Sequence, residues 1–264
     1  MEFIDIHSLN NRLEDIKNRY QSQKPFRYVM FENFFTAEKA EWIHENYPKI
    51  ENETWDGITY LDQKNKFWKN KFEAGSLLDR VMQELNSDVF LHWLQQVTEM
   101  EDTILGDDEL FGGGLHQSIN GAFLNVHVDY NFHPKTKYHR RLNVLVYMNK
   151  DWKDTYEGHL ELWDLSDGKK DFLEKFAPNF NRCVIFETNE ISYHGHPKPL
   201  KTPIGVSRKS IATYYYTKTR PSTEVAQEHN THYVNTEGVT GQIKTFNNGI
   251  KAFFERVSGV FNKK

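Results

Sequence analysis

A histidine and an aspartate separated by one residue are the first candidates for chemistry in this chain. His127 and Asp129 stand at the end of the β-prone run 119–128. Residues i and i+2 of a strand share a face with Cα atoms about 6.5 Å apart, so both side chains can reach one ion. A second histidine would complete a set that suits non-haem Fe(II), because it leaves coordination positions open. The alternative is a solvated ion pair at a strand end.

Two other histidines, His194 and His196, are candidates for the missing ligand. We favour His194, because Pro197 predicts that the strand ends at His196. His159 and Glu161 form a comparable pair two residues apart. We interpret that pair as structural, since one facial site accounts for the chemistry.

A basic residue, Arg208, opens the β-prone run that follows the second histidine segment. A guanidinium binds a carboxylate through two parallel hydrogen bonds. Ser210 shares the strand face of Arg208 and can contact the same carboxylate. A strand histidine followed by this arginine is the pattern that an iron site with a dicarboxylate cosubstrate requires. Taken alone, Arg208 would be interpreted as an exposed strand charge.

The elements that position these residues fall into two parts. The N-terminal part predicts a helix over 8–21, a strand over 26–31, a helix capped by Thr36 and a longer helix over 76–100. Short β-prone runs follow, at 119–128, 141–148, 159–163, 182–187 and 209–217. The segment 171–176 is the one place between these runs with a helical character, so the pattern favours an antiparallel sandwich or jelly roll over a parallel α/β sheet.

Residues 115–217 resemble the Fe(II)/2-oxoglutarate-dependent oxygenases, especially the branch that contains the prolyl hydroxylases. Besides the histidine, aspartate and arginine motifs, the resemblance is carried by the segments 140–152 and 157–163. It implies an α+β fold with a double-stranded β-helix (jelly-roll) core, N-terminal helices packed on the sheet and a C-terminal amphipathic helix. Because the sequence has no internal repeat and no low-complexity linker, we expect one domain over 1–264, divided into helical support (1–114), metal core (115–217) and C-terminal extension (218–264).

The resemblance assigns a role to several residues. His127, Asp129 and His194 become the iron ligands and catalytic centre, and Arg208 binds the 5-carboxylate of 2-oxoglutarate. The other predicted cosubstrate contacts are Ser210, Tyr147 and Gln117. Gln117 occupies a position where the family often has a tyrosine. Asn143 is expected to share the inward face of its strand with Tyr147.

The resemblance further implies a hydroxylase that uses Fe(II), 2-oxoglutarate and O2 and releases succinate and CO2. The substrate is a small molecule or a residue of a peptide, such as proline. A carboxylate at Asp129, where halogenating relatives have Gly or Ala, argues against halogenation. The alternative function is a non-catalytic jelly-roll protein that binds a metal or a sugar.

Composition excludes several other classes of protein. With 14% aromatic residues in 264, the chain is unlike a disordered protein. The net charge of -4 gives no reason to expect nucleic-acid binding. The single cysteine, Cys183, excludes a disulfide framework, and no apolar run reaches the roughly 18 residues of a membrane span. The start of the chain lacks the features of a signal peptide, so we expect a cytoplasmic protein.

The last segment, 241–264, has an apolar stripe at helical spacing with basic residues between. Three interpretations fit this pattern: packing against the protein's own sheet, a homodimer contact, or a helix on a membrane surface.

Overall fold

The computed structural model describes residues 1–51, 55–60 and 62–238. The predicted helix 241–264 lies outside these residues, so its dimer or membrane contact stays a prediction. Within the described ranges, no helix has both the length and the apolar character needed to cross a bilayer. The single-domain division of the chain also stays a prediction.

Short helices make up most of the N-terminal part. They are α1 (Ile6–Asn11), α2 (Leu13–Ser22), α3 (Ala37–Glu45), α4 (Leu77–Leu85) and α5 (Asp88–Thr98). The helix predicted over 8–21 is interrupted at Arg12, and the one predicted over 76–100 is divided in two. The division occurs because the hydroxyl of Ser87 accepts a hydrogen bond from a backbone N–H and starts a new helix. Thr36 caps α3 in the same way, as predicted.

The strands have the following bounds: β1 (Tyr28–Glu32), β2 (Asp56–Tyr60), β3 (Gln63–Lys69), β4 (Gly114–Val128), β5 (His139–Tyr147), β6 (Leu160–Asp164), β7 (Asp171–Phe176), β8 (Arg182–Glu187), β9 (Tyr193–His196), β10 (Arg208–Thr217) and β11 (His232–Val234). Short 3-10 turns lie at Asp154–Tyr156, Ser166–Gly168 and Ser222–Glu224.

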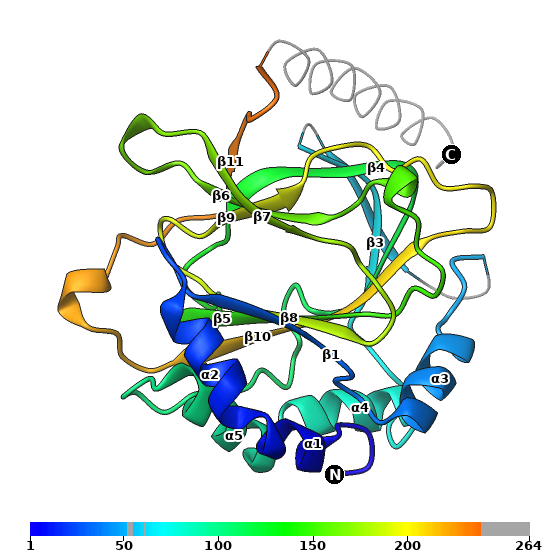
Figure 1. The fold of residues 1–264 in the computed structure, drawn as a ribbon, viewed down its shortest axis with the longest axis horizontal. Helices are drawn as coiled ribbons and strands as arrows, with labels where there is room; N and C mark the ends of the chain where they lie inside the picture. Colours follow the sequence, from blue (N-terminus) through cyan, green and yellow to red (C-terminus); the bar gives the residue numbers. More distant parts are fainter. Residues whose placement is uncertain (52–54, 61, 239–264) are drawn as a thin grey trace, which may run out of the picture.

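The main strands pair antiparallel in the order β1-β8-β5-β10-β4-β9-β6-β7. The long strand β4 belongs to both halves of this path: residues 114–118 pair with β10, whereas 124 and 127 pair with β9. The sheet therefore turns over at β4 into two facing layers (Figure 1). This arrangement confirms the predicted α+β jelly-roll core.

The helical character expected for 171–176 is wrong, because this segment forms strand β7. Six residues are too few for a stable helix without strong caps. Pairing with β6 satisfies their backbone instead, and the ring of Phe172 packs against Trp163 at 5.4 Å between centroids. Strands β2, β3 and β11 were not predicted. The sequence of β3 is mostly polar, and β11 has only three residues.

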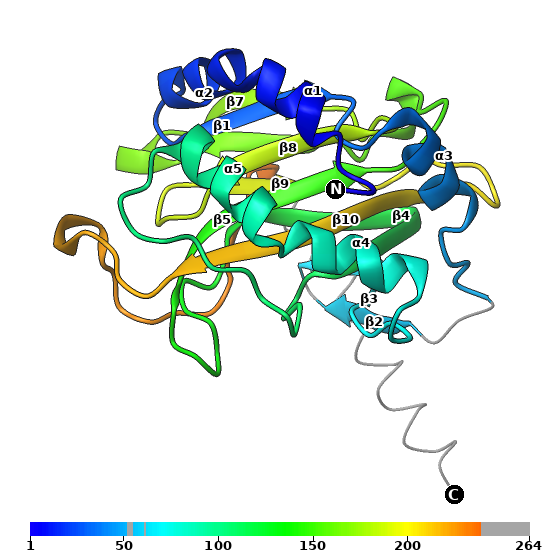
Figure 2. The same ribbon diagram turned by 90° about the horizontal axis from the view of Figure 1, so that it is seen from below.

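The helices cover the outer face of the layer that contains β1, β8, β5 and β10 (Figure 2), as predicted. Aromatic residues fill the space between: Phe90 on α5 packs against Trp93 and against Tyr215 of β10. The hydroxyl of Tyr215 also donates to the carbonyl of Leu85 at 2.8 Å. This contact ties the strand that begins at Arg208 to the helical layer.

The pairing of β9 with β4 requires a glycine at position 195. A Cβ atom there would lie 2.8 Å from the carbonyl oxygens of both Leu124 and Asn125. His194 precedes this glycine and faces His127 in the register. The spacing between the two strands therefore sets the distance between the two histidines.

Replacing Gly195→Ala should push β9 away from β4. We expect the free energy of unfolding to fall by about 1–3 kcal/mol, as for other overpacked sites. Affinity for Mn(II), measured by isothermal titration calorimetry, should fall at least about tenfold, because the two histidines separate. A variant that is destabilised but binds Mn(II) like the unaltered protein would contradict this link between register and metal affinity.

Candidate active site

The structure brings together His127, Asp129 and His194, the residues predicted as metal ligands. Their ligand atoms all lie within 4.8 Å of one another. The carboxylate of Asp129 lies 3.6 Å from Nε2 of His127 and 3.5 Å from Nε2 of His194. His127 comes from β4 and His194 from the paired strand β9, and both rings are buried. Among the described residues, no other cluster of three His, Cys, Asp or Glu side chains could hold a metal ion.

In both histidines, Nε2 faces the carboxylate of Asp129, and Nδ1 is hydrogen-bonded to the backbone. Nδ1 of His127 donates to the carbonyl oxygen of Asn125 at 2.8 Å, and Nδ1 of His194 donates to that of Ser192 at 2.9 Å. Because a carbonyl only accepts, each Nδ1 carries the proton and each Nε2 keeps its lone pair. Burial, together with the neighbouring imidazole of His127, lowers the pKa of His194 to about 3. The ring is therefore neutral at physiological pH, as metal binding requires.

The carboxylate of Asp129 accepts hydrogen bonds on its inner side. Nδ2 of Asn143 donates at 2.7 Å, and a guanidinium nitrogen of Arg140 lies 3.0 Å away. Burial alone would raise the pKa of Asp129, but the cationic neighbours, chiefly Arg140, hold it well below its usual range. An ionised carboxylate and two imidazole lone pairs are the donors that suit a divalent transition-metal ion.

Arg140 is held in place by two aromatic rings and an amide. Its guanidinium lies 3.6 Å from the ring centroid of Tyr214 and 4.4 Å from that of Tyr130. It also donates two hydrogen bonds to Oδ1 of Asn143, at 3.1 and 2.8 Å. Asn143 faces inward, as predicted. Arg140 was missed as a site residue, because strict alternation places it on the outer face. A register irregularity between β5 and β10 next to Arg140 brings it to the inner face.

One cavity connects the histidines and Asp129 with Arg208. Its lining residues come from both layers of the barrel: Lys66, His116, Ser118, Leu124, His127, Asp129, Asn143, Leu145, Leu160, His194, Gly195, His196, Arg208, Ser210 and Tyr214. The metal-type ligands and the predicted carboxylate anchor therefore face a common space. Ser210 lines it beside Arg208, as their shared strand face predicted.

The Arg208 side chain is buried and positioned by two neutral groups. Its Nε donates to the carbonyl oxygen of Gly158 at 2.7 Å, and one terminal nitrogen donates to the hydroxyl of Tyr147 at 3.2 Å. Gly158 has a positive φ of +73°, and a Cβ there would come within 2.3 Å of Leu200. Among the residues that the structure describes, no carboxylate forms an ion pair with Arg208. Its remaining hydrogen-bond capacity is therefore available to an anion in the cavity.

Gln117 is not brought to the cavity. Its side chain donates to the hydroxyl of Ser207 at 2.6 Å, whereas His116 and Ser118, its neighbours on β4, line the cavity. Alternation along the strand explains this placement. The structure therefore gives no support to a cosubstrate contact by Gln117.

The pair His159 and Glu161 also lies apart from the cavity lining. His159 contacts Asp154 at 3.1 Å, and the carboxylate of Glu161 accepts from the indole of Trp163 at 3.1 Å. These contacts agree with the structural interpretation of this pair. His196 lines the cavity, but the ligand group contains His194 instead.

Lys66 lines the cavity as well and was missed, because β3 was not predicted. Burial lowers the pKa of Lys66 to about 8. The charge of Asp129 opposes this effect, whereas the guanidiniums of Arg208 and Arg140 add to it. Lys66 is therefore a cation of the cavity whose charge interacts with the metal-ligand carboxylate and with both arginines.

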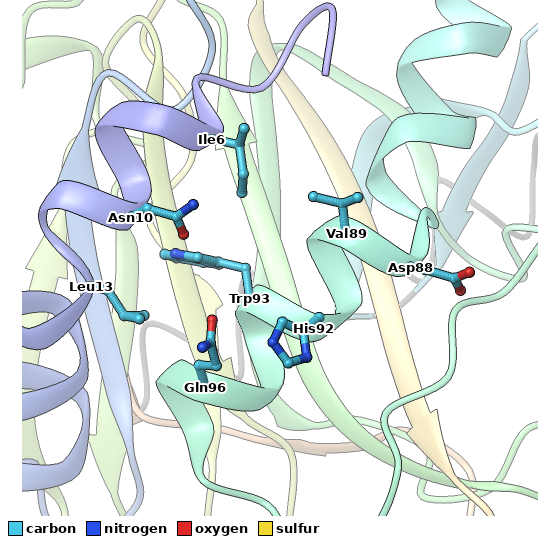
Figure 3. A pocket seen from close by; sticks show the side chains of 8 residues that line it. All are labelled: Ile6, Asn10, Leu13, Asp88, Val89, His92, Trp93 and Gln96. Carbon is cyan, nitrogen blue, oxygen red and sulfur yellow. The ribbon is translucent and has the colours of Figure 1, made fainter.

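A second hollow lies in the helical layer, between α1 and α2 on one side and α5 on the other (Figure 3). Its lining residues are Ile6, Asn10, Leu13, Asp88, Val89, His92, Trp93 and Gln96. None of them belongs to the cavity around Asp129. We therefore place the candidate chemistry in the barrel.

The role of Arg140 is testable through the pH dependence of metal binding. In the variant Arg140→Met, burial should raise the pKa of Asp129, because its main compensating charge is gone. Protonation then competes with the metal ion at a higher pH. We expect the midpoint of a Co(II) titration, followed by absorbance between about pH 4 and pH 8, to move upward, while binding at the alkaline end is retained.

Arg141→Met is the matched control. Arg141 is also a largely buried arginine of β5, but it pairs with Asp102 and Glu224 instead of Asp129. It should leave the pH midpoint in place. An equal midpoint in the Arg140 variant and the unaltered protein would show that Arg140 does not control the charge of Asp129.

Comparison with known proteins agrees with this geometry. Residues 113–216 match the family model described as the 2OG-Fe(II) oxygenase superfamily. A search of curated protein sequences found no match.

Three solved structures with a similar fold are prolyl hydroxylases. An enzyme from Pseudomonas putida is 17% identical, with TM-score 0.51, and the alignment covers 76% of this chain and 98% of that one. One from Trichoplax adhaerens, solved with a hypoxia-inducible-factor peptide, is 16% identical, with TM-score 0.53 and coverages of 80% and 92%. One from Phytophthora capsici is 15% identical, with TM-score 0.55 and coverages of 92% and 76%.

At these identities the structural likeness establishes the fold alone. The family match covers the segment that contains the core strands β4 to β10. The superfamily is one of oxidoreductases that use Fe(II), 2-oxoglutarate and O2. The segment 113–216, which carries His127, Asp129, His194 and Arg208, thus resembles the core of the 2OG-Fe(II) oxygenases, and its fold is similar to that of the prolyl hydroxylases.

Proposed function

We propose that this protein is an Fe(II)- and 2-oxoglutarate-dependent dioxygenase that hydroxylates an unactivated C–H bond of a small molecule or a peptide. The reaction releases succinate and CO2. One observation carries the proposal: a single cavity is lined by two histidines and a carboxylate at one end and by Arg208 at the other. A non-catalytic binding protein would not need a carboxylate anchor beside an open-sided ligand set.

In this proposal His127, Asp129 and His194 hold the iron. Fe(II) with 2-oxoglutarate supplies the oxidising chemistry, in which one oxygen atom reaches the substrate and the other enters succinate. The protein fixes the ligand atoms before the ion arrives, because backbone carbonyls hold both imidazoles. Asn143 and Arg140 hold the carboxylate in the same way. Such supporting hydrogen bonds set ligand orientation and affinity.

Arg208 is proposed to bind the 5-carboxylate of 2-oxoglutarate. Tyr147 orients the guanidinium through its hydroxyl, and Ser210 presents a hydroxyl on the same strand face. Leu145 and Leu160 give the cavity apolar wall area, which excludes water and strengthens the ion pair. The 2-oxoglutarate molecule would then span the cavity from the metal ligands to β10.

The class of substrate is inferred from the same comparison. The Trichoplax adhaerens enzyme was solved with a peptide fragment, which supports a peptide residue as one candidate. A small metabolite is the other. Both kinds of substrate can be screened with the purified protein, by a mass gain of one oxygen atom.

Succinate formation tests the proposed function directly. Purified protein with Fe(II), ascorbate and 2-oxoglutarate should form succinate slowly without substrate and faster when a substrate is present. His127→Ala should abolish this turnover and weaken Fe(II) binding, because the remaining two ligands do not close the site. Succinate formation by the His127 variant at the normal rate would exclude the proposed iron site.

The two histidines of β9 provide a matched pair of variants. We expect His194→Ala to lose turnover and Fe(II) binding, since its Nε2 faces Asp129 at 3.5 Å. His196→Ala should retain substantial activity, because His196 lies outside the ligand group. The reverse pattern in succinate assays would move the distal ligand to His196.

Removing the guanidinium of Arg208 should affect the cosubstrate and spare the metal. Arg208→Met should raise the 2-oxoglutarate Kd by about one to three orders of magnitude, because two charge-assisted hydrogen bonds are lost. Arg208→Lys should restore part of the affinity, since it keeps the charge without the planar fork. The charge-transfer absorbance of the Fe(II) complex, titrated without O2, reports these affinities. Unchanged 2-oxoglutarate affinity in Arg208→Met would place the carboxylate anchor elsewhere.

A further inference from the structure

Lys66 lines the cavity and has no role in the reaction as described so far. It comes from β3, which adds to the edge of β4, and its side chain is only partly buried. Among the described residues, no hydrogen bond or ion pair occupies its ammonium group. An unpaired cation inside a cavity is costly unless a ligand supplies the missing negative charge.

The register places Lys66 in one row with Arg208. Both residues are opposite Ser118 of β4, Lys66 from β3 on one side and Arg208 from β10 on the other. Neighbouring strands lie about 4.8 Å apart, so the two Cα atoms are about 10 Å apart across the row. Lys66, Ser118 and Arg208 all line the same cavity. Because both side chains extend into the cavity, a molecule shorter than this Cα–Cα distance can contact both cationic groups.

The charges in the cavity leave two places for anions. Arg140 and Asp129 lie 3.0 Å apart and compensate each other. Arg208 and Lys66 have no such partner in the described part of the chain. A molecule of 2-oxoglutarate brings two carboxylates, one at each end.

We propose that Lys66 binds the 1-carboxylate of 2-oxoglutarate, the one beside the keto group, while Arg208 binds the 5-carboxylate. This inference rests on the proposed function. Lys66 is favoured for the 1-carboxylate, because Arg208 and Lys66 are the two cations of this cavity without an ion-pair partner in the described part of the chain, and Arg208 is assigned to the other carboxylate. Gln117, the position expected to contact the cosubstrate, turns away from the cavity. Lys66 reaches in from the neighbouring strand and supplies the contact that Gln117 does not make.

Two ligands that differ in one carboxylate separate the roles of the two cations. 2-Oxovalerate keeps the 1-carboxylate and the keto group of 2-oxoglutarate but ends in a methyl group. Kd values for both ligands are measured on the Fe(II)-loaded protein without O2, by the charge-transfer absorbance. The variants are Lys66→Gln, Arg208→Gln and the control Lys64→Gln, which removes a lysine of the same strand that does not line the cavity.

Lys66→Gln should weaken both ligands about tenfold, because both carry the 1-carboxylate. Arg208→Gln should weaken 2-oxoglutarate alone, and Lys64→Gln should change neither Kd. Affinity for Fe(II) by itself should be equal or higher in Lys66→Gln, since a positive charge near the ion is removed. Lys66→Arg should retain more affinity than Lys66→Gln.

Two outcomes would overturn the assignment of Lys66. Unchanged affinity for both ligands in Lys66→Gln would mean that the ammonium serves another molecule, such as an anionic group of the substrate. Loss of 2-oxoglutarate affinity without loss of 2-oxovalerate affinity would mean that Lys66 shares the 5-carboxylate with Arg208. Absence of 2-oxoglutarate binding to the unaltered, Fe(II)-loaded protein is a different result, and it would contradict the proposed function itself.

Discussion

A buried carboxylate that stays ionised is the constraint on which the rest of the site depends. Burial favours the protonated form of Asp129, and a protonated carboxyl is a poor metal ligand. Arg140 and Asn143 reverse that preference through an ion pair and a hydrogen bond. The guanidinium itself is buried and remains tolerable there, because the rings of Tyr130 and Tyr214 lie against it. Removing either Asp129 or Arg140 alone would leave an uncompensated charge inside the barrel.

The fold fixes the two ends of the cavity relative to each other through one strand. Near its start, β4 pairs with β10, which carries Arg208, and near its end it pairs with β9, which carries His194. The helices behind the sheet hold β10 through Tyr215. Strand β4 therefore sets the distance between the residues that contact the two ends of a bound ligand. A binding site needs contact residues held at fixed positions by strands or helices.

Side chains whose positions follow from strand alternation could be predicted from the sequence. Alternation placed His127 on the same face as Asp129 and turned Ser210 and Asn143 toward the cavity, as expected. The order of motifs along the chain identified the jelly roll. Residues that depend on irregular pairing could not be predicted. The irregularity beside Arg140 turns that residue inward, and the polar sequence of β3 conceals Lys66. Gln117 shows the opposite error, since a family position was carried over although its side chain points to the other face of β4.

A crystal of the protein grown with Mn(II) and 2-oxoglutarate without O2 would test the central claim most directly. Anomalous scattering at the manganese edge locates the ion independently of any model of the ligands. We predict one strong peak in the barrel, bound by His127, Asp129 and His194, with 2-oxoglutarate extending from it to Arg208. A peak at His159 and Glu161, or a 2-oxoglutarate molecule bound away from Arg208, would contradict the proposed active site.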